Sequence, residues 1–551
     1  MPYSSKIHHL IVLILCTLFV AVASTLVMGG AAQMGSDALP YLVPVYNWIQ
    51  GDGYRVFGVF PHGSPPGYGL ATLLTYPFVG RVDWAGITLS LFAYGSTLLV
   101  LGSLYQKRFG FFTALLALLT LGLMPGMVNY SVATLAESLF VALLVTSVVC
   151  ALKVWDDPEQ STYSAIALGL ILGFGNSVRP EMLPIAGLMM LILLARHVFH
   201  KQQQRWRGPI IWTIAIFVSL FIANILFIHS HTDKLALHDK SLARIMPKVE
   251  RVMEGKPSPA AKLNYQVSTL EYFRLLGWET LKKRLEVGFW RERHIIFGHL
   301  KPILLIWSMA GLVMLWRYAS GQQPKPNKQN LFFWLPLGLL TAATCFPLLV
   351  YPFYYVNARF LHPSSVMLAL MFIVMAGSWL QQITHHRSWR FKSLLLGLCV
   401  TVLLVGYTPA LQKTWNKAGF YTSHEQAGEW IHKQGLDVGG IISPYRTSLL
   451  HFYASGRALD LAPPPLTRYH KTIPSRSIDW KQPLPSLVNI LRGHKMQHLV
   501  LTTHRLTPPL QALWADPAIA SEAGLLLQHQ TPRFQVYTLN PKTGLKQDGY
   551  R

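Results

Sequence analysis

Long stretches without a charged side chain restrict this chain more than any other feature of its sequence. They cover residues 10–28, 84–105, 209–229, 330–358, 360–383 and 393–411. A helix of about 18–20 apolar residues is long enough to cross the hydrocarbon core of a bilayer. Charged residues make up only 13% of the chain, about half the share of a soluble domain. The sequence therefore predicts an α-helical polytopic membrane protein.

Shorter apolar runs between these stretches raise the expected number of spans to about eleven. We place the spans at residues 10–28, 84–105, 111–127, 133–152, 162–178, 182–198, 209–229, 302–316, 331–351, 363–383 and 393–411. The apolar segment 65–80 is shorter and would make a helix of only about 24 Å. We expect it to lie at the outer membrane surface, because counting it as a span would move every later basic cluster to the other side.

Basic side chains between the spans set the expected orientation. The formal net charge is +24. Short basic clusters lie at residues 107–108, 196–207, 317–328 and 387–392. With a cytoplasmic N-terminus all four clusters are cytoplasmic, as the positive-inside rule requires. This distribution indicates membrane topology and not the basic patch of a nucleic-acid-binding protein. The lipid bilayer is an expected partner, and nucleic acid is not.

Six ionisable side chains that could take part in chemistry lie on the expected outer face. The long outer loops in this topology are residues 29–83 and 230–301. Ionisable groups in or near spans are costly to bury and tend to be functional. Those in or beside the outer segments are Asp37, His62, Glu137, Arg179, Glu181 and Arg359. Their convergence on one face is the strongest indication of function that the residues alone provide.

Two acidic residues are candidates for contact with a substrate. Asp37 follows the first span, where a carboxylate can accept a proton from an attacking hydroxyl. Alternatively, Asp37 caps the helix that follows. Glu137 lies at the start of a span, where it either serves function or complements the positive end of the helix dipole. Spacing alone leaves both alternatives open for each residue.

Two arginines are candidates for binding a phosphate group. The forked guanidinium groups of Arg179 and Arg359 match the oxygens of a phosphate. Each could instead anchor the chain at the membrane interface, and Arg179 could simply pair with Glu181. Arg55 and His62 in the first outer loop are further candidates for substrate binding.

The sequence contains no pattern that predicts a metal site. His229, His231 and His238 lack the spacing of a tetrahedral ligand set. The four cysteines all lie in apolar runs, where we interpret them as small buried hydrophobic residues.

The tail, residues 412–551, changes character and contains no run long enough to span a membrane. We expect helices at residues 425–434, 484–493 and 508–514, and strands at residues 439–443, 498–502 and 533–539. This pattern predicts a small α/β domain. It contains no glycine-rich phosphate loop and no catalytic triad pattern, so we interpret it as a cap or docking module.

Five short motifs occur in order along residues 1–411. They are Asp37 before a helix ending near Gly51, then Pro65-Pro66-Gly67-Tyr68, Glu137-Ser138-Leu139-Phe140, Arg179-Pro180-Glu181 and Arg359-Phe360-Leu361-His362-Pro363. In this set and order the chain resembles the GT-C superfamily of polytopic glycosyltransferases, in particular the protein mannosyltransferases and the lipid A aminoarabinose transferases. The resemblance implies a transmembrane glycosyltransferase domain at residues 1–411 and an extracytoplasmic α/β domain at residues 412–551.

The resemblance also implies a reaction and a location. A sugar on a polyprenyl phosphate is transferred with inversion to an extracytoplasmic acceptor, which is a glycan, a lipid or a protein. Asp37 is the implied catalytic base, and the arginines stabilise the leaving phosphate. The implied substrate-binding residues are Arg55, His62, Tyr68, Glu137, Arg179, Glu181 and Arg359. The implied location is a bacterial inner membrane, with the C-terminal domain in the periplasm.

One departure from the family pattern concerns a metal ion. Many relatives carry two adjacent acidic residues in the first outer loop, whereas here Asp37 is followed by Ala38. Some members of the superfamily use a divalent cation, but Asp52 is the nearest further carboxylate in this loop. We therefore expect no required cofactor, and the sequence does not support a divalent metal.

Three other functions compete with a single-sugar transferase. A secondary transporter would place its polar residues near the middle of the bilayer, whereas here they lie at the ends of spans. A polysaccharide polymerase or ligase would use the same kind of donor. A non-catalytic envelope assembly protein would use its outer domain to recruit partners.

Overall fold

The computed structural model describes most of the chain in two compact units. The described residues are 2–28, 38–54, 65–156, 161–199, 204–232, 278–319, 328–348, 358–384, 389–415, 420–436, 441–444, 450, 453, 478–493, 496–502 and 506–540. The first unit contains Met1–Thr25, His62–Phe78 and Trp84–Thr414. The second contains Leu26–Pro61, Val79–Asp83 and Trp415–Arg551. Part of the predicted first outer loop thus belongs to the same unit as the C-terminal tail.

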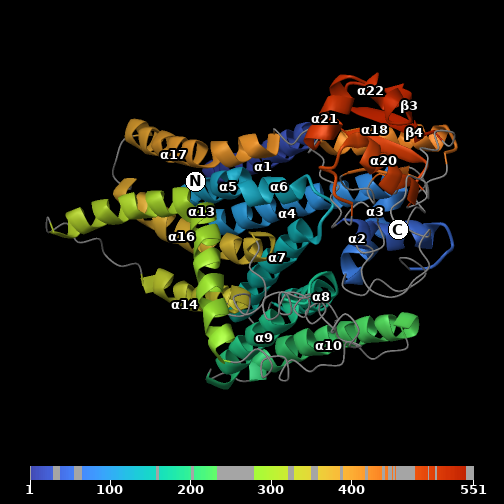
Figure 1. Cartoon of the computed structure of the whole chain (residues 1–551). Coiled ribbons are helices and arrows are strands. Elements are labelled where there is room, and N and C mark those ends of the chain that lie inside the picture. Colours follow the sequence, from blue (N-terminus) through green and yellow to red (C-terminus); the bar gives the residue numbers. More distant parts are fainter. Residues whose placement is uncertain are drawn as a thin grey trace. The chain divides into compact units, whose positions relative to one another are not determined.

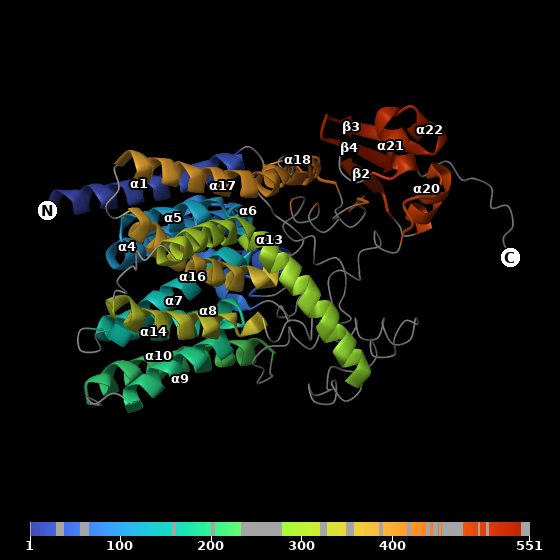
Figure 2. The ribbon, with the colours of Figure 1, turned by 90° about the vertical axis from the view of Figure 1, so that its left-hand side faces the viewer.

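The first unit is a bundle of helices (Figure 1). Its elements are α1 (Pro2–Leu26), α3 (Pro66–Val79), α4 (Val82–Phe109), α5 (Phe111–Leu123), α6 (Pro125–Ser131), α7 (Ala136–Asp156), α8 (Thr162–Val178), α9 (Met182–Phe199), α10 (Gln204–Thr232), α13 (Trp278–Ala319), α14 (Lys328–Cys345), α16 (Ala358–Thr384) and α17 (Trp389–Trp415). Figure 2 shows most of the long helices lying roughly parallel to one another. This arrangement satisfies backbone groups within each helix, as a lipid environment requires.

Within the described residues, each predicted span overlaps a helix, and the span predicted at residues 111–127 is divided between α5 and α6. Seven helices of the described residues are long and apolar enough to cross a membrane, or eight if the bent pair α5 and α6 forms one span. Three shorter apolar helices lie at Thr162–Val178, Met182–Val198 and Pro336–Cys345. The predicted class of polytopic helical membrane protein is confirmed, and the count of about eleven crossings stays a prediction.

Turns in the bundle follow from glycine and proline. Gly110 separates α4 from α5 with a φ of 85°, a conformation that favours glycine. Pro125 begins α6, and the axis bends by 60° between α5 and α6. Many threonine and serine hydroxyls donate to the carbonyl one turn earlier, as Thr97 does to Ala93, which satisfies these groups inside apolar helices.

Helix α13 differs from the expected layout. The sequence placed a span at residues 302–316 and an outer loop before it, whereas α13 runs without a break from Trp278 to Ala319. The charged residues near its start, Lys282, Lys283 and Arg284, interrupt the apolar pattern. They do not end the helix, because Lys and Arg have high helix propensity.

The second unit contains a small sheet with helices. Its elements are α2 (Leu39–Ile49), α18 (Phe420–Lys433), β1 (Ile441–Ile442), α20 (Leu484–Gly493), β2 (His498–Thr502), α21 (Pro508–Ala515), α22 (Ile519–Glu522), β3 (Leu525–Gln530) and β4 (Phe534–Leu539). The strand order is β1-β2-β4-β3. Strand β1 pairs with β2 in parallel, and the other two pairings are antiparallel. A mixed sheet with helices agrees with the α/β class predicted for the tail.

The core of the second unit lies around the sheet. Leu487, Val488 and Leu491 of α20 are fully buried with Leu499 and Leu501 of β2. The spacing of the helical residues puts them on one face of α20, and alternate residues of β2 point to the same side. A second apolar cluster, which includes Ile431 of α18 and Val500 of β2, forms on the other side of the strand.

An ion-pair cluster joins α18 to the segment before α4 within the second unit. Arg81 contacts Asp83 at 2.8 Å, Glu425 at 2.6 Å and Glu429 at 3.5 Å. Burial raises the pKa of the Glu425 carboxyl above its usual value, although the Arg81 guanidinium opposes the shift. The cluster connects residues that are 344 positions apart in the chain.

Candidate functional site

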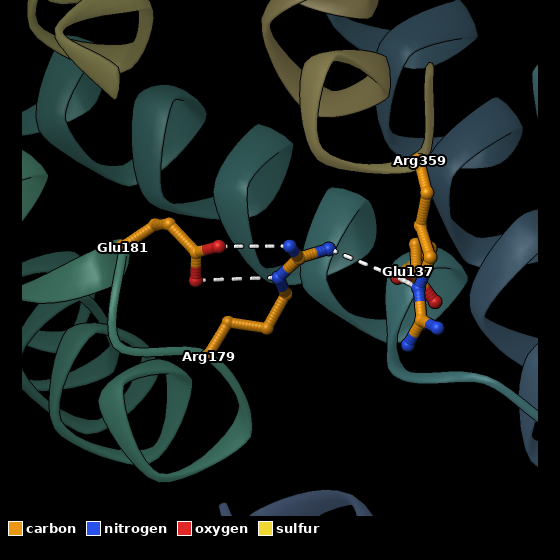
Figure 3. A network of polar contacts seen from close by, with 4 residues as sticks. All are labelled: Glu137, Arg179, Glu181 and Arg359. Atoms are coloured by element: carbon orange, nitrogen blue, oxygen red, sulfur yellow. Dashed lines mark hydrogen bonds and ion pairs between the residues drawn. The ribbon is translucent and has the colours of Figure 1, made fainter. Parts of the chain in front are cut away.

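Four of the predicted site residues meet in the first unit, where the ends of several helices come together. Glu137 lies in the first turn of α7, and Arg359 lies in the first turn of α16. Arg179 and Glu181 lie in the link between α8 and α9. Figure 3 shows their side chains turned toward one another.

The residues around Arg179 explain why it lies at the turn between α8 and α9. Pro180 disfavours the helical conformation of the residue before it, and Arg179 has extended backbone angles with φ −149° and ψ 131°. Helix α8 therefore ends at Val178. The carbonyl oxygen of Arg179 accepts a hydrogen bond from the backbone N–H of Met182 at 3.1 Å, at the start of α9. Arg179 is thus held at the turn between two helices.

The polar contacts form one continuous network. Arg179 donates from Nη2 to Oε1 of Glu181 at 2.8 Å and from Nε to Oε2 at 3.3 Å. Its Nη1 donates to Oε1 of Glu137 at 3.1 Å. Arg359 donates from Nε to the same Oε1 of Glu137. Two guanidinium groups from different parts of the chain therefore share one carboxylate oxygen (Figure 3).

The network is largely removed from solvent. The exposed fraction of the side chain is 0% for Glu137, 6% for Arg179, 13% for Arg359 and 16% for Glu181. Buried charges are tolerated only when they are paired and hydrogen bonded. The Arg179 guanidinium also lies 5.4 Å from the ring centroid of Phe140, a favourable cation–π distance.

Helix termini add to the electrostatics of the site. The N-termini of α7, α9 and α16 lie at the residues of the network. Each N-terminus carries a partial positive charge from its unpaired N–H groups. Helix N-termini and guanidinium groups are both features that favour an anion such as a phosphate.

The Pro-Pro-Gly-Tyr motif packs against the end of α8 that leads to Arg179. A Cβ on Gly67 would lie 2.4 Å from Oγ and 2.6 Å from the backbone carbon of Ser177. Only glycine allows this approach. Tyr68 is fully buried, and its hydroxyl contacts Ser90 Oγ at 3.0 Å and donates to the carbonyl oxygen of Gly86 at 2.9 Å.

The remaining predicted site residues are Asp37, Arg55, His62 and Tyr68. Asp37, Arg55 and His62 lie outside the described residues, so the predictions for them stay predictions. The position of Tyr68 supports a packing role, since a direct contact with substrate would require its hydroxyl to leave these internal partners. The described part of the chain contains no group of three or more His, Cys, Asp or Glu residues suited to a metal ion.

The sequence did not predict that His362 and Tyr130 lie next to the network. His362 is completely buried on α16, and its ring lies 4.9 Å from the ring of Tyr130 on α6. His362 comes three residues after Arg359, a spacing that puts both on one side of a helix. That spacing was the available signal. Tyr130 has no such signal, because the bend between α5 and α6 decides where it lies.

Comparison with solved structures identifies the fold. ArnT from Cupriavidus metallidurans bound to undecaprenyl phosphate matches with a TM-score of 0.55 and 12% identity, over 96% of this chain and 98% of that one. The same protein in the apo state has a TM-score of 0.53 and 12% identity, over 95% and 97% of the two chains. AglB from Archaeoglobus fulgidus, in complex with an inhibitory peptide and a dolichol-phosphate, gives 0.49 and 11%, over 98% and 75%.

The fold defines the class of this protein. It is a polytopic membrane protein with the GT-C fold of membrane glycosyltransferases. Within that class, residues 63–227 match the family model of the dolichyl-phosphate-mannose-protein mannosyltransferases. A comparison with curated proteins finds no match. The resemblance inferred from the ordered motifs is thus confirmed, and the matched segment contains three of them.

Proposed function

We propose that this protein is a membrane glycosyltransferase that moves a sugar from a polyprenyl-phosphate donor to an acceptor outside the cytoplasm. The observation that carries the proposal is the shared contact of Arg179 and Arg359 with Glu137 in a chain of GT-C fold. Two cations held at helix N-termini suit a lipid-linked phosphate. The undecaprenyl phosphate bound to ArnT supports the same class of donor.

Arg179 and Arg359 stabilise the leaving group in this proposal. As the bond from the anomeric carbon to the phosphate oxygen breaks, the bonding electron pair goes to that oxygen. The arginines offset the developing negative charge, so that no general acid is needed. A guanidinium has five N–H donors. Each arginine can therefore bind a phosphate oxygen while it keeps a contact with its carboxylate.

Glu137 and Glu181 hold the arginines in place. Without substrate, two carboxylates balance two guanidinium groups, so the network has no net charge. Glu181 fixes the plane of Arg179 through two parallel hydrogen bonds. This geometry prepares the cations before the donor arrives, which reduces the cost of reorganisation during the reaction.

Asp37 is the proposed base. It accepts the proton of the acceptor hydroxyl while the new bond to the anomeric carbon forms on the face opposite the phosphate. This displacement inverts the anomeric configuration. We further propose that the chain lies in a bacterial inner membrane with a cytoplasmic N-terminus. Residues 1–411 form the transferase domain, and residues 412–551 form a periplasmic domain.

Turnover of a labelled donor tests the proposal. The purified full chain in nanodiscs is given a panel of radiolabelled polyprenyl-phosphate sugars with a crude envelope acceptor, beside the Asp37→Asn variant. We expect transfer by the wild type and a loss of at least 100-fold in the variant, the lower range for general base catalysis. Transfer unaffected by the substitution would remove Asp37 from the mechanism. A folded wild type that turns over no donor would contradict the proposed activity.

A further inference from the structure

Tyr130 on α6 lies near the polar network of Glu137, Arg179, Glu181 and Arg359, but it is not hydrogen bonded to any of these described residues. The phenol interacts electrostatically with Glu137, Arg179 and Arg359 together. Its side chain is half-buried, whereas Glu137 is completely enclosed. Among the described residues, no hydrogen bond partner contacts its hydroxyl. Tyr130 is therefore a partly exposed polar residue close enough to the two guanidinium groups to interact with them.

The ring of Tyr130 is held in place by His362. The two ring centroids are 4.9 Å apart, and the planes are tilted by 50°. His362 fits closely over α6, because a Cβ on Gly126 would lie only 2.4 Å from its Nδ1. Gly126 and Tyr130 are four residues apart on α6 and share one face of that helix. The imidazole thus rests on both of them.

His362 itself has an unusual environment. It is 0% exposed, and neither ring nitrogen has a hydrogen bond partner in the described part of the chain. A buried polar group without a partner is unfavourable. The neighbouring His299, by comparison, has a partner for its Nδ1 in Ser365 Oγ at 3.2 Å. The position of His362 is therefore explained by its ring packing against Tyr130 and Gly126, and not by hydrogen bonds of its own.

We propose that Tyr130 is a further donor-binding residue, whose hydroxyl donates a hydrogen bond to an oxygen of the lipid-linked phosphate, and that His362 positions its ring. The inference rests on the proposed function, because it assumes a phosphate between Arg179 and Arg359. Both arginines are donors only, so a phosphate oxygen that binds them can accept a third hydrogen bond from a phenol. Such bonds to an anion are stronger than neutral ones.

Binding of undecaprenyl phosphate without a sugar tests this inference directly. The full chain in nanodiscs is titrated with the lipid, and stabilisation against thermal unfolding gives the affinity. We expect Tyr130→Phe to weaken binding by roughly tenfold to 100-fold, the range of a lost hydrogen bond to a charged group. The matched control is Tyr94→Phe, which removes a buried hydroxyl that donates to Gly122 at 2.8 Å. The control should melt at a lower temperature and bind the lipid like the wild type.

Variants of His362 test its positioning role. His362→Ala removes the ring that supports Tyr130 and should weaken lipid binding, whereas His362→Phe retains a ring and should restore most of the affinity. In a Tyr130→Phe background, His362→Ala should cause little further loss, because the histidine acts through the hydroxyl that is already missing. A purely structural role for His362 would lower the melting temperature without this dependence on Tyr130.

The outcomes separate the inference from the proposed function. Tyr130→Phe with an affinity within twofold of the wild type would overturn the inference and leave the glycosyltransferase proposal standing. A loss that appears only with the sugar-bearing donor would also overturn it, because the contact would then be to the sugar. A wild type that binds no polyprenyl phosphate and turns over no donor would overturn the proposed function and the inference together.

Discussion

The carboxylate of Glu137 is the point on which the polar network depends, and its removal should destabilise the bundle. Glu137→Gln keeps the shape of the side chain but leaves Arg179 and Arg359 without their shared negative charge. At about 3 Å and an effective dielectric of about 20, each attraction is on the order of 5 kcal/mol. Desolvation cancels much of this gain, and breaking a buried ion pair costs about 3–5 kcal/mol net. We expect a loss of that size in the free energy of unfolding.

A thiol-reactive fluorogenic dye measures this effect. Cys16, Cys150 and Cys399 are buried, so the dye reports unfolding in a denaturant series. The network itself is tested by combining Glu137→Gln with Arg359→Met. The double variant should lose at least about 1 kcal/mol less than the sum of the single variants, since the two side chains interact.

A control variant and a refuting outcome follow from the same geometry. Glu181 is more exposed than Glu137, and within the described network it contacts one arginine where Glu137 contacts two. Glu181→Gln should therefore cost only about 1–2 kcal/mol. A Glu137→Gln variant as stable as the wild type would refute this account of the network. So would fully additive effects in the double variant.

Two further predictions concern the packing of the motif glycine and the second unit. Gly67→Ala places a Cβ 2.4 Å from Ser177 Oγ, so the end of α8 must shift, and donor turnover should fall roughly tenfold or more. The control Gly187→Ala meets no atom within 4 Å and should retain activity. Arg81→Gln should cost about 1 kcal/mol, seen as faster amide hydrogen exchange in α18. Burial raises the pKa of Glu425, so its contribution to stability is present at low pH and is lost as the pH rises through that pKa. Removing Arg81 strengthens this trend, so the difference between the variant and the wild type should be smaller at a pH below the pKa of the Glu425 carboxyl than at a pH above it. An equal difference at both pH values would contradict the argument.

Elements with a strong local pattern could be predicted from the sequence. Helix α20 and strand β2 have the expected bounds, because their apolar residues follow the periods of a helix and of a strand. Strand β3 was not predicted. Three leucines in a row begin it, and Leu526 and Leu527 are exposed, so it lacks the alternation of a half-buried strand. It forms because the edge of β4 offers hydrogen bonds, which only the folded sheet provides.

The sequence by itself determined that this protein is a polytopic helical membrane protein, and it placed the key polar residues at the ends of spans. Charge and hydropathy decide these features locally, because each helix must satisfy its own backbone in lipid. The tertiary structure decided which side chains meet. Arg179 and Arg359 lie 42 and 222 positions from Glu137 in the chain. They share one carboxylate oxygen because α7, α8 and α16 pack together. The close approach of the Gly67 motif to α8 is decided in the same way, since local pattern carries no information about a contact between distant helices.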